Sequence, residues 1–164
     1  RDHYQRQLDN ENYFINAFTK NPTNPTNFVQ AIYIHGRRGR TNEILTAIKT
    51  FSPLAGQDPK NLTLIKNAYG LIQRWEDKAL IDEKLTTLTP DDYAPWFDLA
   101  QTRLQLQQTN RATQALKEAL TRFEKRTESS SAVNIIDAIR TNAIFVPLRE
   151  HPEIKPFLKE AGKN

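Results

Sequence analysis

The chain has 164 residues, enough for one domain with a buried core or for a short array of helical repeats. Hydrophobic residues make up 38% and charged residues 26%, a balance typical of globular domains, and no apolar run is long enough to span a membrane. The formal net charge of +4 comes from 23 basic and 19 acidic residues that interleave along the chain, so the charge does not require a polyanionic partner.

The first expected element is a helix over residues 1–21, with Pro22 at the place where it ends. The chain begins at Arg1 and contains no methionine. This indicates a fragment or a processed form of a longer protein. We therefore expect this helix to be half of a helix pair, with the identity of anything upstream left open.

Two expected helix pairs begin with a proline behind an N-cap residue. Pro25 follows Asn24, and Pro59 follows Asp58. Proline fits the first helical position, where its missing N–H has no partner to lose, and Asn or Asp is a natural N-cap. These starts predict helix pairs over residues 25–56 and 59–89.

The stretch IYIHGRRGRTNEIL, residues 32–45, is interpreted as the corner between the two helices of the first pair. Gly39 suits the left-handed conformation that often follows a helix end, and arginines favour the negative end of a helix. No strand precedes the stretch and no Gly-Lys-Ser/Thr follows it, which disfavours a phosphate loop. Contact of Arg37, Arg38 and Arg40 with a phosphate or carboxylate stays open as the alternative.

The third expected pair covers residues 90–124. Its start, Thr89-Pro90-Asp91-Asp92, offers a cap, a proline and acidic residues for the positive end of a helix. Apolar residues then recur at helical spacing on both sides of the polar break QQTNR. They are Trp96, Leu99, Ala100 and Leu104 before the break, and Ala112, Ala115, Leu116, Ala119, Leu120 and Phe123 after it.

Beyond Arg126 the pattern changes. A serine-rich segment precedes Val133, Ile136 and Ile139, which stand at helical spacing, and a terminal helix is expected from Pro152 to about residue 161. Repeat arrays need an atypical closing element, and residues 129–164 fit that role.

Large apolar residues return at a fixed interval just inside each expected helix start. Phe28, Leu62 and Trp96 are 34 residues apart. A single helix pair cannot bury its apolar face alone, so neighbouring pairs must pack together to complete a core.

With these anchors the chain resembles the tetratricopeptide (TPR) repeat family. In the first pair Ile44 and Phe51 stand where the family has small residues, and in the second Lys78 occupies an expected alanine position. Ile81, Leu85 and Leu88 are the alternative apolar residues there. Counting back, Phe14 and Ala17 fit the second helix of an earlier repeat. The third pair matches the family pattern at Trp96, Leu99, Ala100, Ala112, Leu116 and Ala119.

The resemblance implies an all-α fold, an α–α superhelix of antiparallel helix pairs with about three TPR-like repeats. It implies one domain over residues 1–164, with a half-repeat helix before the pairs and a helical cap after them. It also implies a concave groove that receives a peptide or protein segment. The groove residues carried over are Val29, Tyr33, Arg37, Lys60, Thr63, Asn67, Phe97, Asp98 and Gln101.

No set of residues for catalysis, cofactors or metals emerges from the sequence. The lack of cysteine removes thiol chemistry and thiolate metal sites. His3, His35 and His151 do not stand at metal-ligand spacing, and no nucleophile elbow or dinucleotide fingerprint occurs. We therefore expect a protein that is not an enzyme and uses no cofactor or metal.

The leading hypothesis is a non-catalytic protein–protein interaction module. An accessory or spacer domain of a membrane-anchored or enzymatic parent protein is the alternative. Nucleic-acid binding through Arg37, Arg38 and Arg40 is the least favoured hypothesis. The partner and the compartment stay open.

Overall fold

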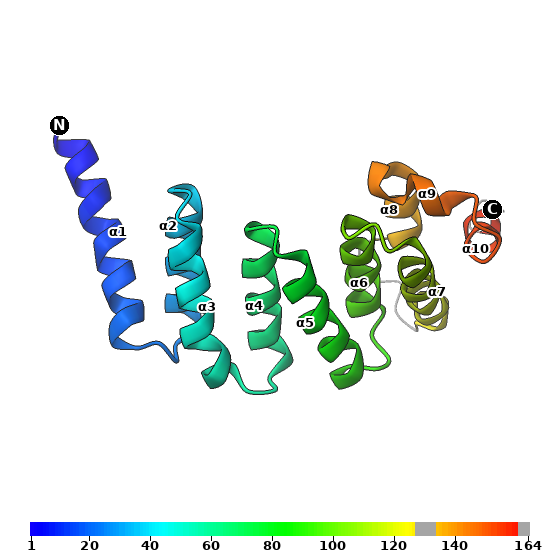
Figure 1. Ribbon diagram of the computed structural model, residues 1–164, viewed down its shortest axis with the longest axis horizontal. Coiled ribbons are helices and arrows are strands. Elements are labelled where there is room, and N and C mark those ends of the chain that lie inside the picture. The colour runs from blue at the N-terminus through cyan, green and yellow to red at the C-terminus, as the bar shows by residue number, and fades with distance from the viewer. Residues whose placement is uncertain (127–133, 161–164) are drawn as a thin grey trace. The chain divides into compact units, whose positions relative to one another are not determined.

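The computed structural model describes residues 1–126 and 134–160, and every element in these ranges is helical (Figure 1). The fold class is all-α, with neighbouring helices packed in antiparallel pairs within the units, as the sequence predicted. The chain divides into two compact units, Arg1–Arg74 and Trp75–Asn164. The first holds α1 (Asp2–Lys20), α2 (Pro25–Arg37), α3 (Thr41–Ala55) and α4 (Pro59–Leu71). The second holds α5 (Trp75–Leu88), α6 (Tyr93–Gln105), α7 (Thr109–Lys125), α8 (Ile135–Thr141), the 3-10 turn η1 (Ala143–Phe145), α9 (Val146–Arg149) and α10 (Lys155–Glu160).

The helix starts repeat at the interval that the sequence indicated. Asn24, Asp58 and Asp92 are the N-caps of α2, α4 and α6. Each side-chain oxygen accepts a hydrogen bond from the backbone N–H two residues on, at 2.9, 2.8 and 2.9 Å. Each cap thus satisfies a backbone donor that a helix start leaves without a partner, and Asn24 satisfies a second one, the N–H of Asn27, at 3.2 Å.

The expected start of the third pair at Thr89 and Pro90 is wrong by a few residues. α6 begins at Tyr93, behind Asp92. Thr89 instead finishes α5, because both its N–H and its hydroxyl donate to the carbonyl oxygen of Leu85, at 3.0 and 2.9 Å. The 34-residue step from Asp58 leads to the correct cap.

The corners that join successive helices repeat in the same way. Gly39, Gln73 and Gln107 are 34 residues apart and have φ angles of +64°, +58° and +58°. The N–H of the residue after each donates to a carbonyl five residues back, at 2.9 Å in all three corners. This is the bonding pattern of a helix C-terminus closed by a left-handed residue. The interpretation of residues 32–45 as a corner is confirmed.

The core of the first unit is built on three phenylalanines from three helices. Phe28 of α2 stacks on Phe51 of α3 with ring centroids 4.3 Å apart, and Phe18 of α1 lies 5.9 Å from Phe28. Phe28, Phe51 and Ile44 are each 1% exposed. The TPR pattern has small residues at positions 44 and 51, and neighbouring side chains then fill the core there. In this chain Phe51 and Ile44 fill that volume themselves.

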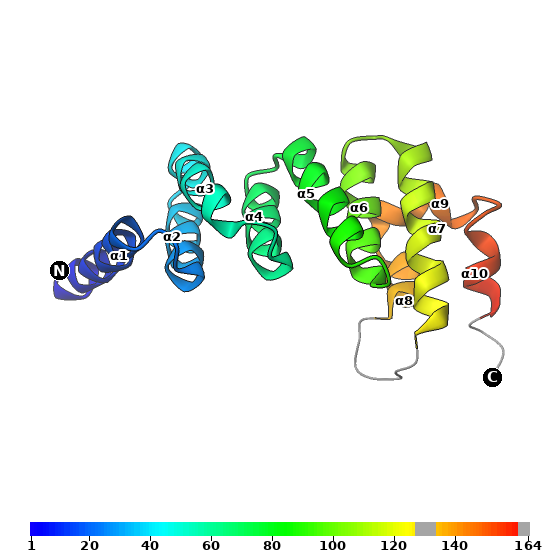
Figure 2. The ribbon, with the colours of Figure 1, turned by 90° about the horizontal axis from the view of Figure 1, so that it is seen from below.

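The core of the second unit lies between α6 and α7, which pack side by side (Figure 2). Ala100, Ala112, Leu116 and Ala119 are fully buried there. Trp96 is half-buried against this cluster, and the guanidinium of Arg122 lies 4.9 Å from its ring centroid. Trp96 packs against the core, as expected.

The C-terminal elements cover one side of this core. Phe145 of η1 stacks on Phe97 of α6 at 5.3 Å, and Ile139 and Leu148 are fully buried. The terminal helix begins at Lys155 instead of Pro152, because His151 closes a turn first. The serine-rich segment and Val133 lie outside the described residues. In the described ranges no helix combines the length and the hydropathy that a membrane span needs.

Candidate binding cleft

A cleft of about 620 Å³ lies between α1 and α2 in the first unit. Its α1 wall consists of residues three or four apart, so they share one face of the helix. The α2 wall has the same spacing. The lining residues are His3, Arg6, Gln7, Asn10, Glu11 and Phe14 of α1, and Gln30, Tyr33, Ile34 and Arg37 of α2.

Apolar side chains line part of the cleft. Ile34 is 6% exposed, whereas Phe14 is 38% and Tyr33 59% exposed. The guanidinium of Arg37 lies 5.7 Å from the ring centroid of Tyr33, within reach of a cation–π contact. The cleft thus presents two accessible aromatic rings and a cation one helical turn from Tyr33.

Glu11 is the lining residue that carries a carboxylate, and an arginine outside the lining binds it. Arg38, at the C-cap of α2, donates from Nε and Nη2 to the two oxygens of Glu11 at 3.0 and 3.1 Å. Gln7 donates to the same carboxylate at 3.3 Å. The side chains of Glu11 and Arg38 are 13% and 29% exposed, so this two-bond ion pair is partly shielded from water.

The groove residues expected in the first unit occupy different places. Tyr33 and Arg37 line the cleft. Val29 is 41% exposed on α2 but is not part of the lining. Lys60 and Asn67 are exposed on α4, and the hydroxyl of the half-buried Thr63 donates to the Pro59 carbonyl at 2.8 Å.

The groove residues expected in the second unit, Phe97, Asp98 and Gln101, are all half-buried on α6. Phe97 packs on Phe145, so part of its ring is covered by the C-terminal elements. A groove formed by residues of both units stays a prediction.

Sequence reasoning missed the contribution of α1 to the cleft. His3, Gln7, Asn10 and Phe14 stand at helical spacing, and this was the available signal. A polar face of this kind is also typical of a solvated helix. The companion wall on α2 comes from a chain segment about twenty residues away, which the pattern within α1 does not reveal.

A second cavity, of about 420 Å³, is lined by residues of α1, α2 and α3, with Pro22 from the turn that follows α1. His35 lines it and is 8% exposed, and its Nδ1 is buried without a hydrogen-bond partner among the described residues. Burial lowers the pKa of His35, and the charge of Arg40 lowers it further, while Glu43 acts in the opposite direction. The imidazole is therefore biased toward its neutral form.

A polar network joins α5 to α6 in the second unit. Lys78 donates to Asp82 Oδ2 at 2.9 Å and to Thr102 Oγ1 at 2.7 Å, and the Thr102 hydroxyl lies 2.8 Å from the same Asp82 oxygen. Lys78 at the expected alanine position is thus explained by a partner on α6.

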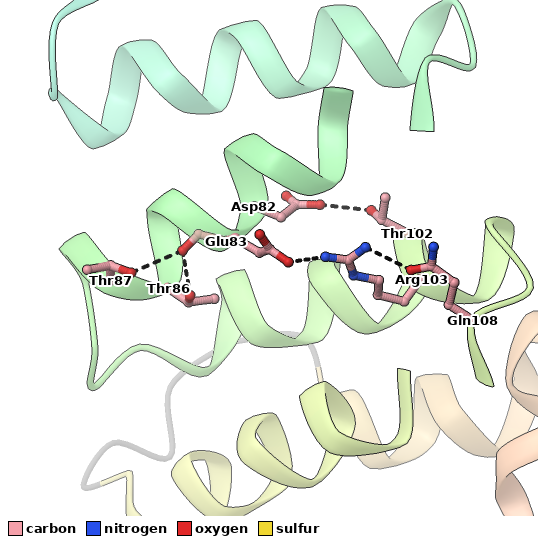
Figure 3. A network of polar contacts seen from close by, with 7 residues as sticks. All are labelled: Asp82, Glu83, Thr86, Thr87, Thr102, Arg103 and Gln108. Carbon is pink, nitrogen blue, oxygen red and sulfur yellow. Dashed lines mark hydrogen bonds and ion pairs between the residues drawn. The ribbon is translucent and has the colours of Figure 1, made fainter. Parts of the chain in front are cut away.

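The network continues along the same two helices. Glu83 pairs with Arg103, which also donates to Gln108 at 2.7 Å, and the Glu83 carbonyl accepts from Thr86 and Thr87 (Figure 3). Asp82 is 0% and Thr102 1% exposed. Asp82 and Thr102 are shielded from water and hold α5 against α6, whereas the Glu83 side chain is 47% exposed.

A solved structure resembles this fold. The crystal structure of MamA, a TPR-like helical protein, aligns with 92% of this chain and 84% of its own chain, with a TM-score of 0.57 and 11% sequence identity. At this identity the likeness shows a TPR-like fold. No family model matches the sequence, and neither does any curated protein.

Proposed function

We propose that this chain is a non-catalytic protein–protein interaction module that binds a peptide or protein segment in the cleft between α1 and α2. A volume of about 620 Å³ lies within the range of roughly 300–1,000 Å³ that is usual for ligand-binding clefts. The cleft lies on two helices of a repeat fold, so its walls are held by the packing beneath them.

The observation that carries the proposal is the pairing of Tyr33 with Arg37 at the cleft. Tyrosine and arginine are enriched where protein interfaces concentrate their binding energy. Here the Arg37 guanidinium lies 5.7 Å from the ring centroid of Tyr33, and a cation–π contact at this distance favours one arrangement of the two side chains before a partner arrives. Less conformational entropy is then lost on binding.

Selection of random peptides displayed on phage against the whole chain tests the proposal without assuming a partner. Calorimetry with a selected peptide should show about tenfold weaker binding by Tyr33→Ala. Tyr4→Ala is the matched control, because Tyr4 and Tyr33 are both 59% exposed and Tyr4 does not line the cleft. Equal losses in both variants, or no selected peptide at all, would contradict the proposed function.

The wider groove implied by the TPR resemblance is tested with the same peptide. Lys60→Ala and Asn67→Ala weaken binding if the bound segment continues along α4. Phe97→Ala tests whether the bound segment also contacts the second unit. Circular dichroism checks that this variant is folded, because the Phe97 ring also packs on Phe145. Unchanged affinity in all these variants would confine the site to the α1–α2 cleft.

A further inference from the structure

The charges that line the cleft are unequal. Two arginines, Arg6 and Arg37, line it, against the one carboxylate of Glu11. Within the described part of the chain neither Arg6 nor Arg37 forms an ion pair. Both guanidinium groups therefore keep donors for an incoming anion.

The carboxylate of Glu11 is already neutralised inside the protein. Arg38 occupies both of its oxygens with two hydrogen bonds, and Gln7 adds a third donor. Because Arg38 does not line the cleft, its charge compensates Glu11 without standing among the groups that a ligand meets. The ligand faces Arg6 and Arg37 with little opposing negative charge.

The remaining surface favours an apolar group beside the anion. Phe14 and Tyr33 are accessible aromatic rings, and Ile34 is a buried wall residue. Arginine binds planar carboxylates through two parallel hydrogen bonds, and the binding is stronger where water is partly excluded.

We propose that the cleft selects a protein segment that carries carboxylates next to an apolar side chain, and that Arg38 sets this selectivity from outside the cleft by neutralising Glu11. This inference rests on the proposed function, because it names the class of segment that the same cleft receives.

Fluorescence anisotropy with designed peptides tests the selectivity. Three labelled peptides share their length and their leucine and phenylalanine residues, and carry glutamate, glutamine or lysine at the alternate positions. The glutamate peptide should bind about tenfold more tightly than the glutamine peptide, and the lysine peptide more weakly than both. Added salt should reduce this difference.

Variants of the ion pair separate selectivity from stability. Arg38→Gln leaves the Glu11 charge uncompensated and should weaken binding of the glutamate peptide about threefold or more, whereas Glu11→Gln should strengthen it by a similar factor. Both variants break the same ion pair. If the pair had a purely structural role, both variants would change the affinity in the same direction. Thermal unfolding by circular dichroism confirms that both variants are folded.

The two lining arginines give a further measurement. Arg6→Gln and Arg37→Gln should each weaken the glutamate peptide about three- to tenfold. Arg111→Gln removes the same charge from an exposed position on α7 of the second unit and should leave the affinity unchanged. An equal effect of Arg111→Gln would mean that the affinity for the glutamate peptide depends only on the net charge of the protein, and the inference would be wrong.

The outcomes distinguish this inference from the proposed function. Tyr33-dependent binding of the glutamine or lysine peptide, as tight as that of the glutamate peptide, would overturn the selectivity and leave the interaction function standing. Tighter binding of a single-stranded oligouridylate than of the glutamate peptide would overturn it in favour of a nucleic-acid ligand. Failure of every peptide, selected or designed, to bind would overturn both.

Discussion

At the scale of single residues, the departures of this chain from a regular repeat have identifiable partners. Lys78 stands where the TPR pattern has alanine, and its ammonium lies between Asp82 and Thr102. The Asp82 partner is one helical turn away and is visible in the sequence, but Thr102 is on the next helix. A pattern read along one helix therefore shows that Lys78 is unusual but not why it is tolerated.

The Lys78–Asp82 ion pair leads to a stability prediction. Lys78→Met removes the cation beside a carboxylate that is 0% exposed and should lower the free energy of unfolding by about 3 kcal/mol. Adding Asp82→Leu to the same protein should recover much of this loss, because two packed apolar side chains replace the buried charges. Urea denaturation of the single and double variants gives the coupling energy.

An exposed ion pair is the matched control for this cycle. Lys117 and Glu153 lie 3.0 Å apart and are 50% and 49% exposed. Lys117→Met should therefore change the stability by less than about 1 kcal/mol. Equal effects of Lys78→Met and Lys117→Met would show that burial does not strengthen the Lys78–Asp82 pair.

The buried His35 makes stability depend on pH in a defined direction. Its pKa in the folded protein is below the ordinary value of 6.5, so the unfolded chain takes up a proton first as the pH falls. The stabilising contribution is present above pH 6.5 and is lost as the pH falls through the pKa of the folded state. His35→Gln should flatten the dependence of unfolding free energy on pH as the pH falls below 6.5.

The histidine prediction is checked by urea unfolding at several pH values. The variant retains His3 and His151, so the difference between the two proteins isolates His35. Parallel stability curves for wild type and variant would contradict it, and NMR titration of the ring would then show an ordinary pKa.

At the scale of elements, the repeat of the sequence becomes a repeat of backbone geometry. N-caps at Asn24, Asp58 and Asp92 and left-handed corners at Gly39, Gln73 and Gln107 recur at one interval. Two of the corners have glutamine in place of glycine. The same hydrogen bond closes all three corners, so the left-handed turn forms with either residue.

Removing glycine from one corner and introducing it at another should change the free energy of unfolding in opposite directions. Gly39→Ala places a Cβ on a backbone at φ +64° and should cost about 1 kcal/mol, although no atom lies within 4 Å of the added carbon. Gln107→Gly relieves the same strain and should stabilise by up to about 1 kcal/mol. Chemical denaturation measures both. Destabilisation by Gln107→Gly would mean that its side chain contributes contacts that outweigh the strain.

The sequence was most informative about helices and least informative about contacts between them. The anchors Phe28 and Leu62 are buried as expected, because one apolar face repeated at helical spacing is a local property. The start of α6 was misplaced because a threonine–proline pair resembles a helix start wherever it occurs. Of the residues that line the cleft, the sequence predicted only Tyr33 and Arg37. The α1 wall was missed because it depends on how α1 lies beside α2.

At the scale of the whole molecule, each unit has a buried core of its own. Phe18, Phe28 and Phe51 form the first, and the α6–α7 interface forms the second. Repeat proteins gain stability from neighbouring elements and not from one closed core, so a local defect need not spread through the chain.

Phe51→Ala tests this independence. Loss of the ring that stacks on Phe28 should cost about 3–5 kcal/mol. Hydrogen exchange should accelerate in α2 and α3 and stay unchanged in α6 and α7. Uniform acceleration along the chain would instead indicate a single cooperative unit.

The division into two units also determines what intrinsic tryptophan fluorescence measures in this protein. Trp75 and Trp96 are its two tryptophans, and both belong to the second unit, whereas the cleft belongs to the first. Indole emission therefore comes from residues of the second unit, and neither tryptophan lines the cleft. A peptide with its own tryptophan would bring the missing fluorophore to the cleft, and its emission would then mark occupancy.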